Sequence, residues 1–180
     1  MAPLSQVPEQ DQLPNIIDNA IEDVNNILQF DRLVITVDAE EMTRQEKIDE
    51  IKQFLGNKKC RVEIRIVIQF FCFEAWALGN QKIIKRNPSS TKLRKYRNFY
   101  DVRLKDPELL PEKKDEELTR SQFAEKYLRI ALNDRFRNLT YRKNDPKALL
   151  HEKYFNELVK RLTTTSHIMS FEDFLSAFKN

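Results

Sequence analysis

The sequence predicts an α/β protein with a small, mainly parallel sheet flanked by helices and with a helical C-terminal half. Two short runs rich in β-branched residues lie early in the chain, at 33–37 and 62–68, with one helical stretch between them. A strand, a crossover helix and a second strand are the usual order of a parallel pair. Beyond residue 119 the apolar residues recur at helical spacing, so the second half is expected to add helices.

Length and composition favour one domain. A chain of 180 residues with 41% apolar and 33% charged residues can bury a core of its own. We predict a flexible tail at 1–13, rich in proline and glutamine, and a single domain at 14–180. The longest apolar run is too short to cross a bilayer and the N-terminus has no leader pattern, so we expect a cytoplasmic protein without membrane contact.

The first helix and the first strand have clear local signals. Pro14 suits the first turn of a helix, and an apolar stripe follows it at helical spacing: Ile17, Ile21, Val24 and Leu28. The run at 33–37 is continuously apolar apart from Thr36, which is typical of a strand covered on both faces.

The second helix and strand are equally well marked. Thr43 and Glu46 form a capping box that begins the helix, and Gly56 ends it. The segment 62–68 alternates strictly, with Val62, Ile64, Ile66 and Ile68 on its apolar face. This strand is therefore expected to have one wet or lightly covered face, near a sheet edge.

The rest of the chain is predicted to be helical with one irregular stretch. Residues 70–78 are apolar enough for a buried helix directly after the second strand, whereas 80–114 is broken by prolines. Helices resume at Thr119 and at Asp145. The last one begins at Ser170 and has an apolar stripe that predicts docking on the core: Phe171, Phe174, Leu175 and Phe178.

Carboxylates follow both predicted strands. Asp38 and Glu40 come directly after the first, and Glu74 stands among aromatic residues after the second. Asp38 and Glu40 project on the same side while the chain stays extended. Parallel strands end at the same edge of a sheet, so Glu74 is expected to approach them. Oxygen ligands so placed suit Mg²⁺ or Mn²⁺, and we take these three residues as candidate metal ligands and catalytic residues.

Each acidic candidate also has an ordinary structural interpretation. Asp38 and Glu40 fit a solvated turn that leads into the Thr43 cap, because acids are favoured near a helix N-terminus. A charged Glu74 among aromatic residues needs a partner, and a hydrogen bond or an arginine would serve as well as a metal. The spacing alone leaves both interpretations open.

A basic segment, residues 82–103, follows the second acidic candidate. The net charge of +3 is too small for a globally basic protein, but this segment is locally cationic. Its candidate nucleic-acid contacts are Lys82, Lys85, Arg86, Arg94, Lys95, Tyr96 and Arg97. Cations neutralise phosphates and aromatic rings stack on unpaired bases. Alternatively, Tyr96 and the nearby aromatic residues anchor the segment to the core. With only two glycines, no glycine-rich phosphate loop is available.

Several of these segments together resemble a known family. They are LVITVDAEE, CFEAWALGN, the stretch Tyr141-Arg-Lys143 and the closing SFEDFLSAF. The chain resembles the small Toprim-fold proteins of restriction and phage-defence loci, the RloB-like group and its relatives. The resemblance implies a Toprim-like sheet and Mg²⁺-dependent phosphodiester chemistry. Asp38 and Glu40 match the family's Asp-x-Asp pair, with Glu in the second place, and Glu74 matches a later acid.

The resemblance departs from the family at one point. The family's first strand, with its catalytic glutamate, should precede the helix that Pro14 begins, and residues 1–13 do not supply it. Two functions follow as hypotheses. One is a Mg²⁺-dependent, nuclease-type nucleic-acid-processing protein or subunit of a defence system. The other is a catalytically inactive module that binds a protein partner, or a second copy of itself, through the open sheet edge.

Overall fold

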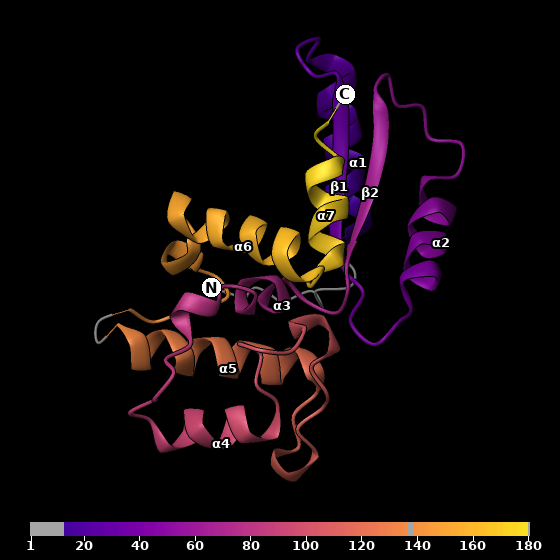
Figure 1. The fold of residues 1–180 in the computed structure, drawn as a ribbon. Coiled ribbons are helices and arrows are strands. Elements are labelled where there is room, and N and C mark those ends of the chain that lie inside the picture. Colours follow the sequence, from indigo (N-terminus) through magenta and orange to yellow (C-terminus); the bar gives the residue numbers. More distant parts are fainter. Residues whose placement is uncertain (1–12, 137–138, 180) are drawn as a thin grey trace, which may run out of the picture.

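The computed structural model describes residues 13–136 and 139–179 (Figure 1). Within these residues it contains seven α-helices and one parallel sheet of two strands. The order is α1 (Leu13–Asn26), β1 (Arg32–Asp38), α2 (Arg44–Leu55), β2 (Glu63–Gln69), α3 (Phe73–Leu78), α4 (Thr91–Phe99), α5 (Arg120–Arg135), α6 (Glu152–Thr165) and α7 (Met169–Ser176). The predicted α/β class with a helical C-terminal half is confirmed. The predicted tail lies outside the described residues, except for Leu13, which belongs to α1.

The two strands pair in parallel, as predicted. Leu33 lies opposite Ile64, and Asp38, the last residue of β1, lies opposite Gln69. The helix between them, α2, begins at the predicted capping box, in which the Thr43 side chain accepts a hydrogen bond from the Glu46 amide. In the described part of the chain neither strand pairs with a third one, so both outer edges of the sheet are unpaired there.

The apolar face of the sheet builds a small core of its own. Ile35 of β1 packs in one buried cluster with Ile17 and Ile21 of α1 and Ile51 of α2. Ile64 and Ile66 of β2 pack against the same cluster, as the alternating pattern predicts.

The other face of the sheet carries cations that hold the end of α7, which lies along the strands in Figure 1. Arg32 donates to the carbonyl oxygens of Ala177 and Lys179, and Arg65 donates to those of Ser176 and Lys179. The last carbonyls of a helix have no partner within it, and positive charge is favourable there. The lightly covered face is thus closed by α7.

The larger core lies between α3, α5, α6 and α7, and α3 is its central element. Every α3 residue except Phe73 is buried. The indole nitrogen of Trp76 donates to the Ser170 hydroxyl at 2.7 Å and to the Glu108 carboxylate at 3.2 Å. Because the Ser170 hydroxyl donates to Glu108, it does not cap α7, which begins at Met169. The predicted start at Ser170 is corrected by one residue.

The helix predicted at 70–78 begins later than expected. The carbonyl oxygen of Gln69 accepts from the Ala39 amide at 2.9 Å, and that of Phe71 accepts from Glu40 at 3.2 Å. These bonds prolong the contact between the two chain segments beyond the sheet, so α3 starts only at Phe73.

Two other helices also depart from the prediction. The stretch 80–114 contains α4, whose cap is the Ser90 side chain, which accepts from the Leu93 amide. Near Asp145 the chain first forms a 3₁₀ turn, Pro146–Leu149, and α6 begins after His151, which caps it. In the described residues no helix combines the length and the apolar character of a membrane span.

Gly79, directly after α3, provides a test of this packing. A Cβ atom there would lie 2.8 Å from the Trp76 carbonyl oxygen and 2.9 Å from Ile168 Cδ1. We expect Gly79→Ala to lower the free energy of unfolding by about 1–3 kcal/mol because the core must move to admit the methyl group. Urea denaturation would measure the loss. Asn156→Ala, at an exposed position of α6, is the control and should change stability by less than about 0.5 kcal/mol.

Candidate functional site

The carboxyl ends of the two strands bring Asp38 and Glu74 into one acidic cluster. Asp38 ends β1, and Glu74 lies in the first turn of α3, shortly after β2 ends. Burial and, after it, the negative charge of Glu74 raise the pKa of Asp38. The sequence prediction that Glu74 approaches Asp38 therefore holds.

Glu74 is almost entirely buried and is held by a neutral hydrogen-bond donor. Its side chain is 2% exposed, and its Oε1 accepts a hydrogen bond from the Tyr141 hydroxyl at 2.8 Å. Burial and the adjacent carboxylate raise the pKa of Tyr141, which keeps the phenol protonated as a donor. Because Tyr141 supplies no positive charge, the hydrogen bond orients Glu74 without neutralising it.

Asp38 is the most perturbed carboxyl group of this cluster. Burial and the charge of Glu74 raise its pKa to about 6 from an ordinary value of 3.8, although Lys143 and the Phe73 amide oppose the rise. Glu40 adds a smaller repulsion. A carboxylate with a raised pKa beside a second acid is ionised at neutral pH only at a free-energy cost, which a bound cation would remove.

Glu40 lies in a turn and not in the extended segment that its spacing assumes. The extended chain ends at Asp38, Ala39 is fully buried, and Glu40 has a positive φ of 54°. Its side chain is exposed, yet its charge still acts on Asp38, so only the assumption of an extended backbone is corrected. Over the two described ranges, no three His, Cys, Asp or Glu residues are grouped so that they could hold a metal ion. The acidic pair is Asp38 and Glu74.

Three further residues of this cluster were not candidates in the sequence. Lys143 acts on Asp38 from the segment that also supplies Tyr141, and both come from far along the chain. Arg120, at the start of α5, lies 3.7 Å from the Glu41 carboxylate and packs on the ring of Phe71. Only the fold brings these side chains to the carboxyl edge of the sheet.

Cys72 also adjoins the acidic pair. It is 1% exposed, and burial together with the charge of Glu74 raises the pKa of its thiol. The thiol therefore stays protonated at neutral pH, and a thiolate nucleophile is not expected here.

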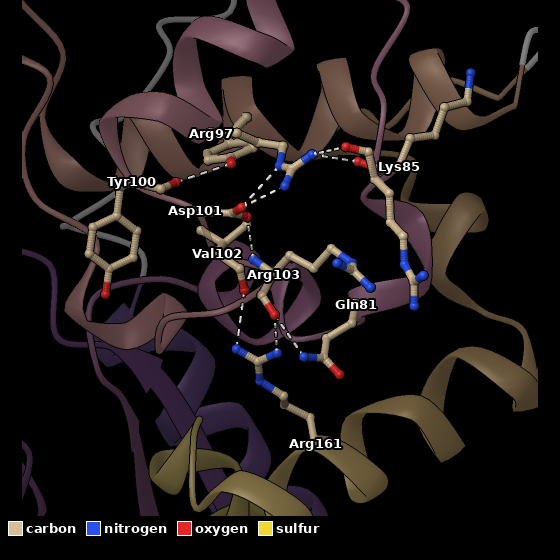
Figure 2. Close-up of polar contacts among 10 residues, drawn as sticks. Gln81, Lys85, Arg97, Tyr100, Asp101, Val102, Arg103 and Arg161 are labelled. Atoms are coloured by element: carbon tan, nitrogen blue, oxygen red, sulfur yellow. Dashed lines mark hydrogen bonds and ion pairs between the residues drawn. The ribbon is translucent and has the colours of Figure 1, made fainter.

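Two predicted nucleic-acid contacts of the basic segment, Tyr96 and Arg97, make contacts within the protein instead. Tyr96 is fully buried, and its hydroxyl donates to Glu116 at 2.9 Å. A ring in that position cannot stack on a base, so we correct its predicted role to the anchoring alternative. Arg97 is used internally, because its guanidinium binds Asp101 and the carbonyl oxygens of Lys85 and Arg86 (Figure 2).

The other cations of the segment differ in their availability. Lys82 pairs with Glu157, and Lys85 pairs with Asp134. Arg94 bonds the carbonyl oxygen of Pro88 and the hydroxyl of Thr91. Arg86 and Lys95 are exposed, and no ion pair holds either of them within the described ranges. These two are the candidates of the segment best placed to meet a ligand.

Comparisons with family models, with curated proteins and with solved structures found no match to this chain.

The hydrogen bond between Tyr141 and Glu74 can be tested directly. Tyr141→Phe removes the hydroxyl and leaves a buried carboxylate oxygen without that donor. We therefore expect the free energy of unfolding to fall by about 1–3 kcal/mol. Chemical denaturation at neutral pH would measure the change. Tyr100→Phe is a matched control, since its hydroxyl donates to the Asp106 carbonyl away from the acidic pair. An unchanged stability of Tyr141→Phe would contradict the proposed orientation of Glu74.

Proposed function

We propose that this chain is a Toprim-like, metal-dependent nucleic-acid-processing protein of the nuclease type, or such a subunit of a defence system. Asp38 and Glu74 are the proposed ligands of Mg²⁺ or Mn²⁺. The observation that carries the proposal is the acidic pair at the carboxyl edge of a parallel sheet, with the pKa of Asp38 raised by burial and by Glu74.

The donor set of the acidic pair fits such a metal. Mg²⁺ takes one or two carboxylates from a protein and completes its shell with water and phosphate oxygens. Asp38 and Glu74 supply two oxygen ligands whose mutual repulsion a divalent cation would relieve. When bound, the metal would supply Lewis-acid activation of a phosphate ester and of water.

The surrounding residues have supporting roles in this proposal. Tyr141 holds Glu74 in place through its hydroxyl, and Lys143 and Arg120 bring positive charge to the edge of the site. Such cations would attract a phosphate group and partly balance the negative charge of the acidic pair. Arg86 and Lys95 in the basic segment would neutralise further phosphates of a nucleic-acid chain.

Metal binding tests the proposal first. We expect Mn²⁺ and Mg²⁺ to bind the wild type in calorimetry and to raise its melting temperature by mass action. Asp38→Asn removes one ligand charge at nearly constant shape and should abolish both effects. Glu41→Gln, a neighbouring exposed acid, is the matched control and should bind metal normally. A melting temperature of the wild type that does not move at millimolar Mn²⁺ would refute the metal site.

Cleavage then tests the activity. A labelled single strand and a duplex, incubated with Mn²⁺, should be cut by the wild type and by Glu41→Gln but not by Asp38→Asn. Charge reversal of Arg86 and Lys95 should weaken binding, and more steeply at low salt, because each neutralised phosphate releases counterions.

The alternative function, an inactive module that binds a protein, has an observation of its own. In the described residues β1 and β2 pair only with each other, so their outer edges offer free backbone groups. A strand from a partner or a second copy could pair there. Light scattering and co-purification would support this alternative if they show a stable complex while the wild type binds no metal.

A further inference from the structure

A cationic groove lies away from the strand ends, where the chain turns out of α3. It encloses about 560 Å³ and is lined from η2 (Gln81–Ile83), α5, α6 and neighbouring segments. Its lining includes one acid, Glu157, and six cations: Lys82, Lys85, Arg86, Arg103, Arg135 and Lys160. Three of these cations, Lys82, Lys85 and Arg86, are among the nucleic-acid contacts predicted in the basic segment. The fold brings the other three to the same groove.

Most of this positive charge is not compensated by the protein. Glu157 pairs with Lys82 at 2.5 Å, and Asp134 pairs with Lys85 at 3.3 Å. Among the described residues no acid forms an ion pair with the other four cations of the groove. Like charges gathered in one concavity concentrate the field and favour a ligand with several negative charges.

The backbone beneath these side chains is held firmly (Figure 2). The carbonyl oxygen of Arg103 accepts from Gln81 at 2.7 Å and from Arg161 at 2.8 Å. Arg97 donates to the carbonyl oxygen of Lys85 at 2.8 Å. The Arg103 guanidinium itself makes none of these contacts. The cations are thus presented from an ordered base, which lowers the cost of binding an anion.

An apolar cavity adjoins the groove. It encloses about 520 Å³ and shares three lining residues with the groove: Lys82, Arg135 and Glu157. Its other walls include Ile83, Leu132, Phe136 and Tyr154. Phe136 is 46% exposed, so part of its ring is available to a ligand. Both cavities are of the size that small-molecule sites usually have.

We propose that the two cavities together bind a nucleoside polyphosphate, with its phosphates in the cationic groove and its base in the apolar cavity. This ligand combines a compact multiple anion with a flat, largely apolar ring, as the adjoining cavities require. The chain has only two glycines, so side-chain cations replace the glycine-rich backbone loop that cradles phosphates elsewhere. This site is separate from the acidic pair and goes beyond the proposed function.

The test is calorimetric titration of the full chain with ATP, carried out in EDTA so that the acidic pair plays no part. Inorganic triphosphate tests the groove alone, because it has no base. A 5′-triphosphorylated oligonucleotide tests whether the bound nucleotide is the end of a strand. The groove variant is Arg103→Gln with Lys160→Gln, and the cavity variant is Phe136→Ser. Lys52→Gln with Lys59→Gln removes the same charge from exposed positions elsewhere and is the control.

The expected pattern separates the two cavities. The groove variant should weaken ATP and triphosphate by about tenfold or more, because charge-assisted contacts are lost. Phe136→Ser should weaken ATP by about fivefold or more and leave triphosphate unchanged, since a stacked ring is lost. The control should bind as the wild type does. If the oligonucleotide binds more tightly than ATP, the nucleotide that this site recognises is the 5′ end of a nucleic-acid strand.

Three results would overturn the assignment. They are no binding of ATP by the wild type, an equal loss in the control variant, or triphosphate binding as tight as ATP with no effect of Phe136→Ser. Asp38→Asn distinguishes this site from the proposed metal site, because it should bind ATP normally in EDTA whether or not the acidic pair holds a metal.

Discussion

Replacing Arg161 by methionine is expected to lower the free energy of unfolding by about 3–5 kcal/mol. The side chain is 1% exposed, and its guanidinium donates to the carbonyl oxygens of Val102, Arg103 and Lys105. Burial lowers the pKa of Arg161, yet the group remains a cation at neutral pH. Methionine fills a similar volume but leaves the carbonyl oxygens of Val102 and Lys105 without this donor, whereas that of Arg103 keeps its bond from Gln81.

Urea denaturation followed by tryptophan fluorescence would measure the loss, since Trp76 lies in the same core. Lys160→Met, one position earlier and exposed, is the matched control and should change stability by less than about 0.5 kcal/mol. Arg161→Lys keeps the charge but not the planar fork, so its stability should fall between those of the wild type and Arg161→Met. A loss below about 1 kcal/mol in Arg161→Met would show that water replaces the guanidinium at these carbonyls.

The role of Arg161 illustrates what the sequence could not predict. Its spacing places it on the buried stripe of α6 with Tyr154, Leu158 and Leu162, but no local pattern identifies the groups that it binds there. The acceptors that bury it are backbone carbonyls about 58 residues earlier in the chain, and carbonyls have no sequence signature. The same holds for Arg97, which the composition of the basic segment marks as a ligand contact and the fold uses internally.

Local patterns predicted the sheet correctly because each rests on contacts within a few residues. The alternation at 62–68 fixes which face of β2 is buried, and the Thr43 capping box fixes where α2 begins. Element ends were less predictable. α4 was missed because two buried residues, Leu93 and Tyr96, give its apolar stripe among many charges. α3 starts late because the residues before it pair with the chain after β1.

The candidate site was predictable only in part. The rule that parallel strands end at one edge predicted the interaction of Asp38 with Glu74, whereas the spacing argument for Glu40 assumed an extended backbone and the chain turns after Ala39. Tyr141 and Lys143 come from a distant segment, where no spacing rule applies.

The rigid helix α3 links the acidic pair to the cationic groove. Glu74 lies in its first turn, and Gln81 and Lys82 follow shortly after its last residue. Because α3 is buried except for Phe73, neither site can shift relative to the other without disturbing the core.

Asp38→Asn is expected to stabilise the metal-free protein at neutral pH by up to about 3 kcal/mol. Burial and Glu74 raise the pKa of Asp38 to about 6, above its ordinary 3.8. A folded-state pKa above the unfolded one means that the native protein binds the proton more tightly. Proton binding by Asp38 therefore contributes fully to the free energy of unfolding below about pH 4, and this contribution is lost as the pH rises through 6. Asparagine is neutral throughout, so the variant avoids this loss.

The stability difference between Asp38→Asn and the wild type should thus be small at pH 4 and grow until about pH 7. Urea denaturation at several pH values in EDTA would trace it, with Glu41→Gln as the control, whose carboxylate is exposed. Saturating Mn²⁺ at pH 7.5 should reverse the order, because the cation stabilises only the protein that keeps both carboxylates. A wild type as stable as Asp38→Asn at pH 7.5 in EDTA would mean that neither burial nor Glu74 disfavours the charge of Asp38, and the reason for placing a metal beside it would be lost.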